Sequence, residues 1–271
     1  MMLIEQNEPR TYVLEVRSRS RPLDSEPIAW LFVERQEKYR RDETDGSIYE
    51  ASIRLTYEEI VTAAPNRVSR KGQFCGGFSR RTADKPLVSL TSSSISKGAV
   101  YLDLPGLEGM RIGTYLMNQI VKWAKQWPDA TVRSIELLAG QAYSENKVRR
   151  NRFYEQFGLV FDYKDSEQRE GLSQPMLAKA LIPVDTWSSN IREREVRDAL
   201  EWALYDRVQT NMTLSSRDQA VKHLLDVIKR AEAAPFRWAL RQIWWRLAPI
   251  LAQIGLLLLL VMLVKESVDL R

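Results

Sequence analysis

Alternating apolar and polar residues recur through the first part of the chain, a pattern typical of β-strands with one buried face. Successive side chains of a strand point to opposite faces of its sheet, so each alternation predicts one half-buried strand. Continuous apolar runs between polar segments predict strands that are buried on both faces. Strands are predicted at 11–18, 47–55, 86–92 and 98–103, and the apolar run 27–33 is compatible with a strand or with the start of a helix.

Polar segments between these strands predict the connections. The charged segment 36–46 predicts a solvated loop or helix end. Segment 56–64 (TYEEIVTAA) predicts a short helix, with Thr56 as its N-cap and Glu59 at the capping-box position. Glycine, serine and basic residues dominate 66–85, which predicts a mobile surface loop, with a substrate-facing loop or a phosphate patch as the alternative.

A helical period replaces the alternation after residue 111. Apolar residues recurring every three or four positions predict a helix over 112–126. A second helix is predicted over 144–157, with Ser144 as its N-cap and Gly158 just after its C-terminus. Further strands are predicted at 132–139, 159–163 and 176–184. The pattern therefore predicts an α+β domain with a mixed sheet over 1–184.

The C-terminal region has a different character. Charged segments with apolar residues at helical spacing predict an amphipathic α-helical stalk over 185–233, and a homodimer formed through a coiled coil is a possible extension of this interpretation. A basic, aromatic juxtamembrane segment follows at 234–246. Residues 247–264 are uncharged and would form a helix roughly 27 Å long, which predicts one C-terminal transmembrane helix. A buried helix or an oligomer seam is the alternative, and 265–271 would form a short tail.

Basic residues concentrate before this apolar segment, whereas basic and acidic residues balance after it. The positive-inside rule then places the N-terminal bulk in the cytoplasm. The predicted location is an inner or cytoplasmic-facing membrane, with the chain crossing the lipid bilayer once.

Composition excludes several kinds of site. The net charge of +5 is too small to indicate a nucleic-acid partner, so none is expected. The one cysteine, Cys75, cannot form a disulfide within the chain. The single histidine, His223, cannot build a histidine-rich metal site or supply Ser-His-Asp chemistry, and no metal is expected.

Residues 98–114 (GAVYLDLPGLEGMRIGT) contain the most informative local pattern. They predict a buried strand, a turn at Pro105 and Gly106, and a loop that carries Gly109 and Gly113 into the helix at 112–126. The first turn of a helix presents unpaired backbone N–H groups and the positive end of the helix dipole. This arrangement predicts an anion site, and phosphate is the typical ligand.

The order of these elements resembles the GNAT superfamily of N-acetyltransferases over 98–184. Glu108–Thr114 stands where that family has its pyrophosphate loop, Arg/Gln-x-x-Gly-x-Gly/Ala. Gly113 matches the second glycine, while Glu108 replaces the Arg/Gln and Arg111 replaces the first glycine.

A second motif, 151–160 (NRFYEQFGLV), is similar to the family segment A-x-x-F-Y-x-x-x-G-F. The resemblance implies direct transfer of an acetyl group from acetyl-CoA to an amine acceptor whose identity is open. It implies that Tyr154 is the general acid toward the departing sulfur. Asp103 and Glu136 are alternative general bases. A catalytically inactive GNAT-fold binding or regulatory module at the membrane is the alternative function.

The resemblance also implies a set of cofactor contacts. The backbone of 102–104 would pair with pantetheine, and the loop at the helix start would bind the pyrophosphate. The implied acetyl-CoA-binding residues are Leu102, Asp103, Leu104, Glu108, Gly109, Met110, Arg111, Ile112, Gly113, Thr114, Asn146, Asn151, Phe153 and Tyr154.

Overall fold

The structure is a computed structural model, and it describes residues 3–21, 25–60, 70–80, 85–94, 104–143 and 146–269. Within these ranges the side chains of 3–6 and 256–269 are not described. The chain divides into two compact units, Met1–Leu200 and Glu201–Arg271. The predicted strand at 98–103 and the predicted N-cap Ser144 lie outside the described residues.

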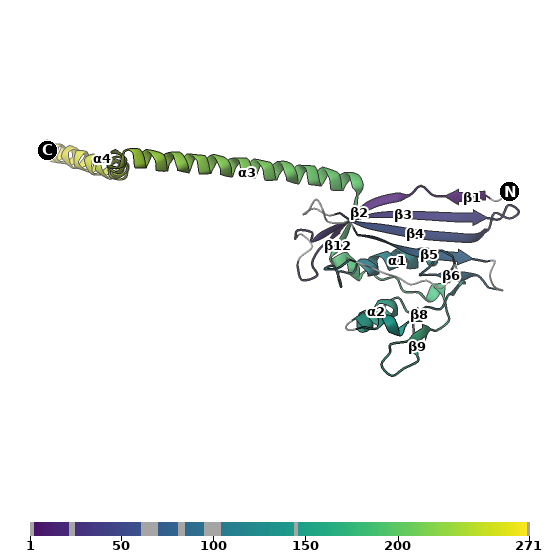
Figure 1. Cartoon of the computed structure of the whole chain (residues 1–271). Coiled ribbons are helices and arrows are strands. Elements are labelled where there is room, and N and C mark those ends of the chain that lie inside the picture. Colours follow the sequence, from purple (N-terminus) through teal and green to yellow (C-terminus); the bar gives the residue numbers. More distant parts are fainter. Residues whose placement is uncertain are drawn as a thin grey trace. The chain divides into compact units, whose positions relative to one another are not determined.

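The first unit is built on a mixed sheet that contains nine strands among the described residues (Figure 1). Its strand order is β11-β7-β6-β5-β4-β3-β2-β12, and β1 pairs with the C-terminal part of β3. The pair β6–β7 is parallel, whereas the other described pairs are antiparallel. The strands are β1 (Leu3–Gln6), β2 (Arg10–Val16), β3 (Ala29–Arg41), β4 (Ile48–Ile60), β5 (Lys71–Ser79), β6 (Leu87–Ser89), β7 (Thr131–Val132), β11 (Met176–Leu177) and β12 (Ile191–Glu195).

A smaller sheet, in the order β8-β10-β9, continues from the β7–β11 end of the main sheet. Its strands are β8 (Glu136–Leu137), β9 (Phe161–Tyr163) and β10 (Gly171–Ser173). β7 and β8 are successive parts of one extended segment, as are β10 and β11, and the two segments pair in both sheets. Helix α2 (Asn146–Glu155) lies beside the smaller sheet (Figure 1). The predicted strand at 176–184 is wrong beyond Leu177, because a 3₁₀ turn (Ala178–Ala180) follows.

Charged residues within β3 correct the prediction of a loop at 36–46. Arg35, Glu37 and Tyr39 share the face of the strand that lies beneath helix α1 (Ile112–Ala124). Arg35 pairs with Glu37 at 2.6 Å and donates to the side chain of Gln119 on α1 at 2.8 Å. Tyr39 donates to Glu37 at 2.5 Å. The polar side chains satisfy one another under the helix, so the strand continues through a segment that looks solvated in sequence.

The predicted helix at 56–64 is also wrong, because β4 extends to Ile60. Ile53, Leu55 and Tyr57 are all buried, and the residues between them are not. The two-residue period of a strand therefore continues past Thr56. Residues 61–64 lie outside the described residues.

Close approach of α1 to the sheet explains why part of the glycine-rich segment 66–85 forms β5 rather than a loop. A Cβ atom at Gly76 would lie 2.8 Å from Ile120 Cγ2 and 3.0 Å from Ile53 Cγ2, distances that real Cβ atoms rarely tolerate. The absence of a side chain lets the apolar face of α1 pack directly on the strand. Trp123 and Trp127 extend this core, and Phe78 stacks on Trp127 with ring centroids 4.1 Å apart.

Strand β12 corrects the prediction that residues from 185 onward form a helical stalk. Ile191–Glu195 pairs with β2 along its whole length. Glu15 on β2 is buried and accepts from Arg17 at 2.6 Å and from Arg194 on β12. This buried charge group ties the last strand to the sheet, and helix α3 (Val196–Ala233) begins only after it.

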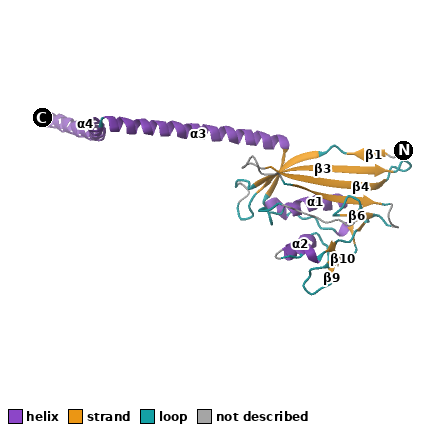
Figure 2. Cartoon of the chain, viewed as in Figure 1, coloured by secondary structure: helices purple, strands orange, loops and turns teal. Residues whose placement is uncertain are grey.

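The second unit is helical (Figure 2), and α4 (Pro235–Asp269) follows α3 after a one-residue interruption. None of the helices in the described part of the chain combines the length and apolar character that a membrane-spanning segment needs. This finding overturns the prediction of a transmembrane helix at 247–264. The predicted span is part of a helix that starts at Pro235, and the described side chains of that helix include Arg237, Arg241 and Arg246.

A buried tyrosine makes the stability of the first unit sensitive to alkaline pH. Tyr115 is fully buried and donates to Glu193 at 2.7 Å, and burial, with neighbouring Tyr12 and Glu193, raises its pKa far above the usual value of 10. Above pH 10 the unfolded chain loses this proton while the folded chain keeps it. The folded state then binds more protons, so its stability decreases as pH rises.

We expect Tyr115→Phe to weaken this pH dependence in urea denaturation measured below and above pH 10. At neutral pH the loss of the hydrogen bond should cost about 1 kcal/mol. Tyr143→Phe, at an exposed position, is the matched control. Equal alkaline destabilisation of wild type and Tyr115→Phe would contradict the prediction.

Candidate functional site

The candidate site lies at the N-terminus of α1, where residues 104–111 enter the helix. This loop turns twice, because Leu107 N–H donates to the Leu104 carbonyl at 3.0 Å and Met110 N–H donates to the Leu107 carbonyl at 3.2 Å. Leu104 and Leu107 are buried and anchor the loop in the core. Leu104 therefore closes a turn, whereas the other two predicted pantetheine contacts, Leu102 and Asp103, lie outside the described residues.

The first turn of α1 presents backbone donors that its own helix does not use. Its first hydrogen bond runs from Tyr115 N–H to the Arg111 carbonyl at 2.9 Å. The N–H groups of Ile112, Gly113 and Thr114 donate to no backbone carbonyl in the part of the chain that the structure describes. Together with the helix dipole, these donors provide a site for an anion such as a phosphate group.

Arg111 has an unusual backbone conformation for a residue with a side chain. It precedes the helix with φ 64° and ψ 15°, in the left-handed region. Gly109 in the same loop has φ 75°. A left-handed conformation costs a non-glycine residue roughly 1–2 kcal/mol. The predicted alignment with the GNAT loop places that family's first glycine at this position, and Arg111 adopts a glycine-like conformation there.

The Arg111 side chain is held by a segment distant in sequence. Its guanidinium donates to the Thr186 carbonyl and, at 2.5 Å, to Ser189 Oγ. Asn190 is buried and donates to the Met110 carbonyl at 2.8 Å. Residues 186–190 thus hold the loop in place. Sequence reasoning missed their role, because a Thr-Trp-Ser-Ser-Asn segment carries no local signal of this contact.

Glu108 supplies the loop with a negative charge of its own. Its carboxylate accepts the N–H of Gly106 at 2.7 Å. Backbone hydrogen bonds, followed by the positive charges of Arg149 and Arg70, lower the pKa of the Glu108 carboxyl. The side chain therefore folds back onto the loop, and it stays ionised at neutral pH.

Five arginines from four segments gather around this loop, and we call them the arginine cluster: Arg19, Arg70, Arg111, Arg149 and Arg152. Arg70 donates to the Pro105 carbonyl at 3.3 Å. Burial, and then the positive charges of Arg19 and Arg152, lower the pKa of Arg111. Among the described residues, no member of the cluster forms an ion pair with a carboxylate.

The cluster is therefore a concentration of positive charge beside free backbone donors. Such a combination favours a ligand with several negative charges. The sequence predicts Arg111 as a cofactor contact, groups Arg149 and Arg152 with Arg150 on one helix, and gives a phosphate patch as the alternative for segment 66–85, which contains Arg70. Arg19 approaches the loop only through the fold.

The two motifs meet at one hydrogen bond. Gln156, which directly follows α2, donates through Nε2 to Thr114 Oγ1 on α1 at 3.2 Å. The start of α1 and the C-terminal end of α2 are therefore neighbours in the fold.

Tyr154 is the candidate acid of this site. It is 6% exposed and packs against Phe153 and Phe161, with ring centroids 5.0 and 6.0 Å away. Burial raises its pKa to about 12, and the positive charge of Arg150 partly opposes this effect. Its hydroxyl forms no hydrogen bond with the described residues, so the proton remains available for a ligand.

Arg150 and Asn151 are structural residues of α2. Arg150 is buried and donates to the carbonyls of Leu138 and Arg169, both at 2.8 Å. Asn151 donates to the Gln168 carbonyl at 3.0 Å and accepts from Arg150 at 3.1 Å. These bonds use both polar atoms of the Asn151 side chain, and its predicted contact with the cofactor stays a prediction.

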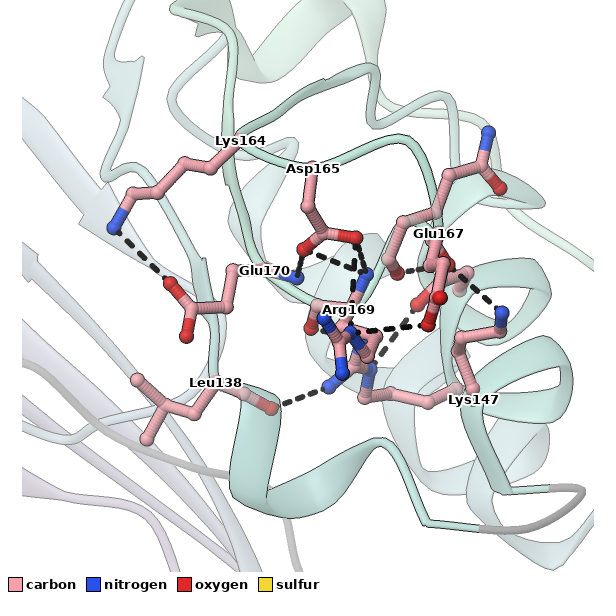
Figure 3. Close-up of polar contacts among 10 residues, drawn as sticks. Leu138, Lys147, Lys164, Asp165, Glu167, Arg169 and Glu170 are labelled. Atoms are coloured by element: carbon pink, nitrogen blue, oxygen red, sulfur yellow. Dashed lines mark hydrogen bonds and ion pairs between the residues drawn. The ribbon is translucent and has the colours of Figure 1, made fainter.

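The loop 164–170, which contains Gln168 and Arg169, is held at further points, as Figure 3 shows. The Asp165 carboxylate accepts the N–H groups of Arg169 and Glu170, each at 3.1 Å. Lys147 on α2 donates to the Glu167 carbonyl at 2.8 Å. α2 is thereby fixed against a rigid loop, which restrains the position of Tyr154.

Asn146 begins α2 and makes local contacts. Its Nδ2 donates to the Gln141 carbonyl at 2.7 Å, and its Oδ1 accepts from Arg149 at 3.3 Å. It orients one arginine of the cluster, and its amide N–H is already used by the chain.

The parallel strands β6 and β7 pair over a short distance only. Leu87 faces Thr131 and Val88 faces Val132, and the last bond runs from Arg133 N–H to the Val88 carbonyl at 2.8 Å. The chain then continues as β8, which pairs with β10 on its other side. Glu136, a candidate base, lies on β8 opposite Leu172, beyond the point where pairing with β6 ends.

No group of three or more His, Cys, Asp or Glu residues within the described ranges is placed to hold a metal ion.

The left-handed backbone of Arg111 can be tested with a matched pair of variants. Arg111→Ala and Arg111→Gly both remove the guanidinium, and only Ala keeps the Cβ atom that is strained at positive φ. We expect Arg111→Gly to be more stable than Arg111→Ala by about 1 kcal/mol in urea denaturation. Equal stability of the two variants would show that this position is not left-handed.

Comparison with known proteins adds no family to this geometry. No protein-family model matches the chain, and no curated protein and no solved structure matches it. The function is therefore inferred from the site itself and from the resemblance of its two motifs.

Proposed function

We propose that the first unit is an acyl-CoA-dependent N-acetyltransferase, which moves an acetyl group from acetyl-CoA to an amine by direct attack. The observation that carries the proposal is the arginine cluster around the free N–H groups of α1. Coenzyme A carries a pyrophosphate and a ribose phosphate, so it presents several negative charges to such a site. The two GNAT-like motifs, which are joined by the hydrogen bond between Gln156 and Thr114, support the same proposal.

The free donors at the start of α1 suit the pyrophosphate. The N–H groups of Ile112, Gly113 and Thr114 are available, and they lie at the positive end of a helix of 13 residues. Arg149 and Arg152 are the two members of the arginine cluster on α2. They suit the ribose phosphate, because a guanidinium can bind phosphate oxygens in pairs.

The backbone of 102–104 would hold the pantetheine arm, as the resemblance implies. An extended amide-containing chain can pair with a strand through backbone hydrogen bonds. Leu104, at the end of this segment, is buried and leads into the loop before α1. An arm that follows this segment would therefore begin near the N–H groups at the start of α1.

The reaction needs one bond to form and one to break. The neutral amine attacks the thioester carbonyl carbon and forms a C–N bond, and the tetrahedral intermediate then collapses with loss of the C–S bond. The amine proton passes to a base, for which Glu136 and Asp103 are the candidates. The departing sulfur accepts a hydrogen bond from Tyr154.

The raised pKa of Tyr154 defines its contribution. With a pKa of about 12, the phenol stays protonated at neutral pH and can always donate a hydrogen bond. A thiol has a pKa near 8.5, so complete proton transfer from Tyr154 to the thiolate is uphill by roughly 5 kcal/mol. Tyr154 therefore acts by stabilising the developing thiolate, and solvent completes the protonation.

A non-catalytic acyl-CoA-binding module is the second candidate, and two observations favour it. The Glu108 carboxylate already occupies the Gly106 N–H, and Arg111 stands where the family has glycine. Both features weaken a pyrophosphate site relative to the family pattern. Binding of acetyl-CoA without turnover of any amine would select this candidate.

Acetyl-CoA binding is tested by thermal denaturation of the full chain. We expect the melting temperature to rise with acetyl-CoA concentration, because a ligand that binds the folded state stabilises it. Glu108→Gln should bind several-fold more tightly, since it removes a negative charge beside the phosphates. Glu8→Gln, at an exposed position, is the charge-matched control and should bind like wild type. No shift at saturating concentrations would reject the proposal.

Tyr154→Phe separates chemistry from binding. We expect kcat to fall about 100-fold with acetyl-CoA affinity nearly unchanged, because only the hydrogen bond to the departing sulfur is lost. Turnover is measured as the free CoA that acetyl-CoA releases in the presence of a panel of primary amines. Tyr163→Phe is the control, since that hydroxyl donates to Glu155 and not to the site. An unchanged kcat would remove Tyr154 from the chemistry.

A further inference from the structure

The first half of α4 has a charge pattern that sets it apart from the rest of the chain. Between Glu232 and Glu266 the sequence contains no acidic residue, yet it contains Arg237, Arg241 and Arg246. Every charged residue in this range is therefore basic, and the three arginines lie within 237–246. Such a surface attracts anions and repels other positive surfaces.

Six apolar residues of this segment form one continuous stripe, whereas Trp238 and Trp245 lie on the opposite side of the helix. Spacings of four and three residues alternate without a break through Phe236, Leu240, Ile243, Leu247, Ile250 and Ile254. At about 100° per residue these positions fall on one side of the helix. Trp244 and Leu251 widen the stripe on one flank. Arg237 and Arg241 lie beyond that flank, and Arg246 lies beyond the other.

These apolar side chains are exposed in the structure. Phe236 is 85% exposed and Leu240 is 67% exposed, and Ile243, Leu247, Ile250 and Ile254 are each about half exposed. A helix with a broad uncovered apolar face is not stable in water on its own, and it needs a partner that removes this face from solvent.

We propose that residues 235–255 of α4 lie on the surface of an anionic lipid membrane, with the apolar stripe among the acyl chains and the arginines at the headgroups. This inference is independent of the acetyltransferase proposal. It places the helix in the plane of the interface. Arginines that flank an apolar stripe can extend to the phosphates while their stems cover apolar surface.

The charges favour lipid over a second copy of the chain. Two copies paired through their stripes would bring flanking arginines together, and residues 233–265 offer no carboxylate to neutralise them. A stripe widened by Trp244 and Leu251 is also broader than the narrow seam of a two-helix coiled coil. An anionic membrane supplies both the apolar medium and the opposite charge.

The test is flotation of the full chain with vesicles of phosphatidylcholine alone or mixed with phosphatidylglycerol. We expect binding to the anionic vesicles, little binding to the neutral ones, and weaker binding as salt increases. Replacing Arg237, Arg241 and Arg246 together by Gln should weaken binding to anionic vesicles on the order of 100-fold. The matched control replaces Arg207, Arg217 and Lys222 on α3 by Gln and should bind like wild type.

A second variant tests the apolar face. Leu240, Leu247 and Leu251 replaced together by Ser should abolish vesicle binding, whereas Leu204, Leu214 and Leu225 of α3 replaced by Ser should not. Equal binding to neutral and anionic vesicles would overturn the proposal. So would a concentration-dependent dimer in sedimentation equilibrium that the α4 leucine variant abolishes, if vesicle binding is absent, since a second copy would then cover the face.

Discussion

The close packing of α1 on the sheet is the constraint on which the candidate site depends. Gly76 lets Ile120 approach β5 to a distance that a Cβ atom would block. That contact fixes the axis of the helix, and the axis fixes where its N-terminus emerges. The free N–H groups of the first turn then lie next to α2, where Thr114 meets Gln156. A glycine in the middle of a strand thus sets the position of an anion site at the far end of a helix, because a rigid helix transmits the placement along its length.

Opposing charges decide what this N-terminus can bind. Glu108 provides the loop with an internal carboxylate and keeps the Gly106 N–H occupied. Arg70 and Arg149 act on that carboxylate, while Arg19 and Arg152 lie close enough to Arg111 to lower its pKa. Among these described groups, one carboxylate stands against five guanidinium groups, so their summed charge is positive. A singly charged ligand would compete poorly with Glu108, whereas a polyphosphate would gain from several arginines at once.

Local sequence patterns predicted the parts of the molecule that depend on neighbouring residues. The helices that became α1 and α2, and the loop between Gly106 and Ile112, are found where glycine positions and helical periods placed them. The errors lie where distant residues decide the outcome. Glu37 in β3 and Glu15 in β2 look solvated in sequence, but arginines from their own and other strands pair with them beneath the surface. The contacts by which residues 186–190 hold the loop, and the approach of Arg19 and Arg70 to it, likewise depend on tertiary structure. The prediction of a membrane span rested on the apolar run at 247–264 and gave less weight to the arginines before it. The helix that contains both begins at Pro235.

Arg150 links the structural and the chemical halves of the site. Its guanidinium is buried, and its partners are the carbonyls of Leu138 and Arg169 and the amide of Asn151, which are all neutral. Carbonyl oxygens solvate a positive charge without cancelling it, so the full charge acts on its surroundings. It opposes the effect of burial on the pKa of Tyr154. Under the proposed chemistry, a thiolate formed beside Tyr154 would be stabilised by the same charge at the moment the C–S bond breaks. A residue that anchors a loop through backbone carbonyls can therefore contribute to the reaction without touching the substrate.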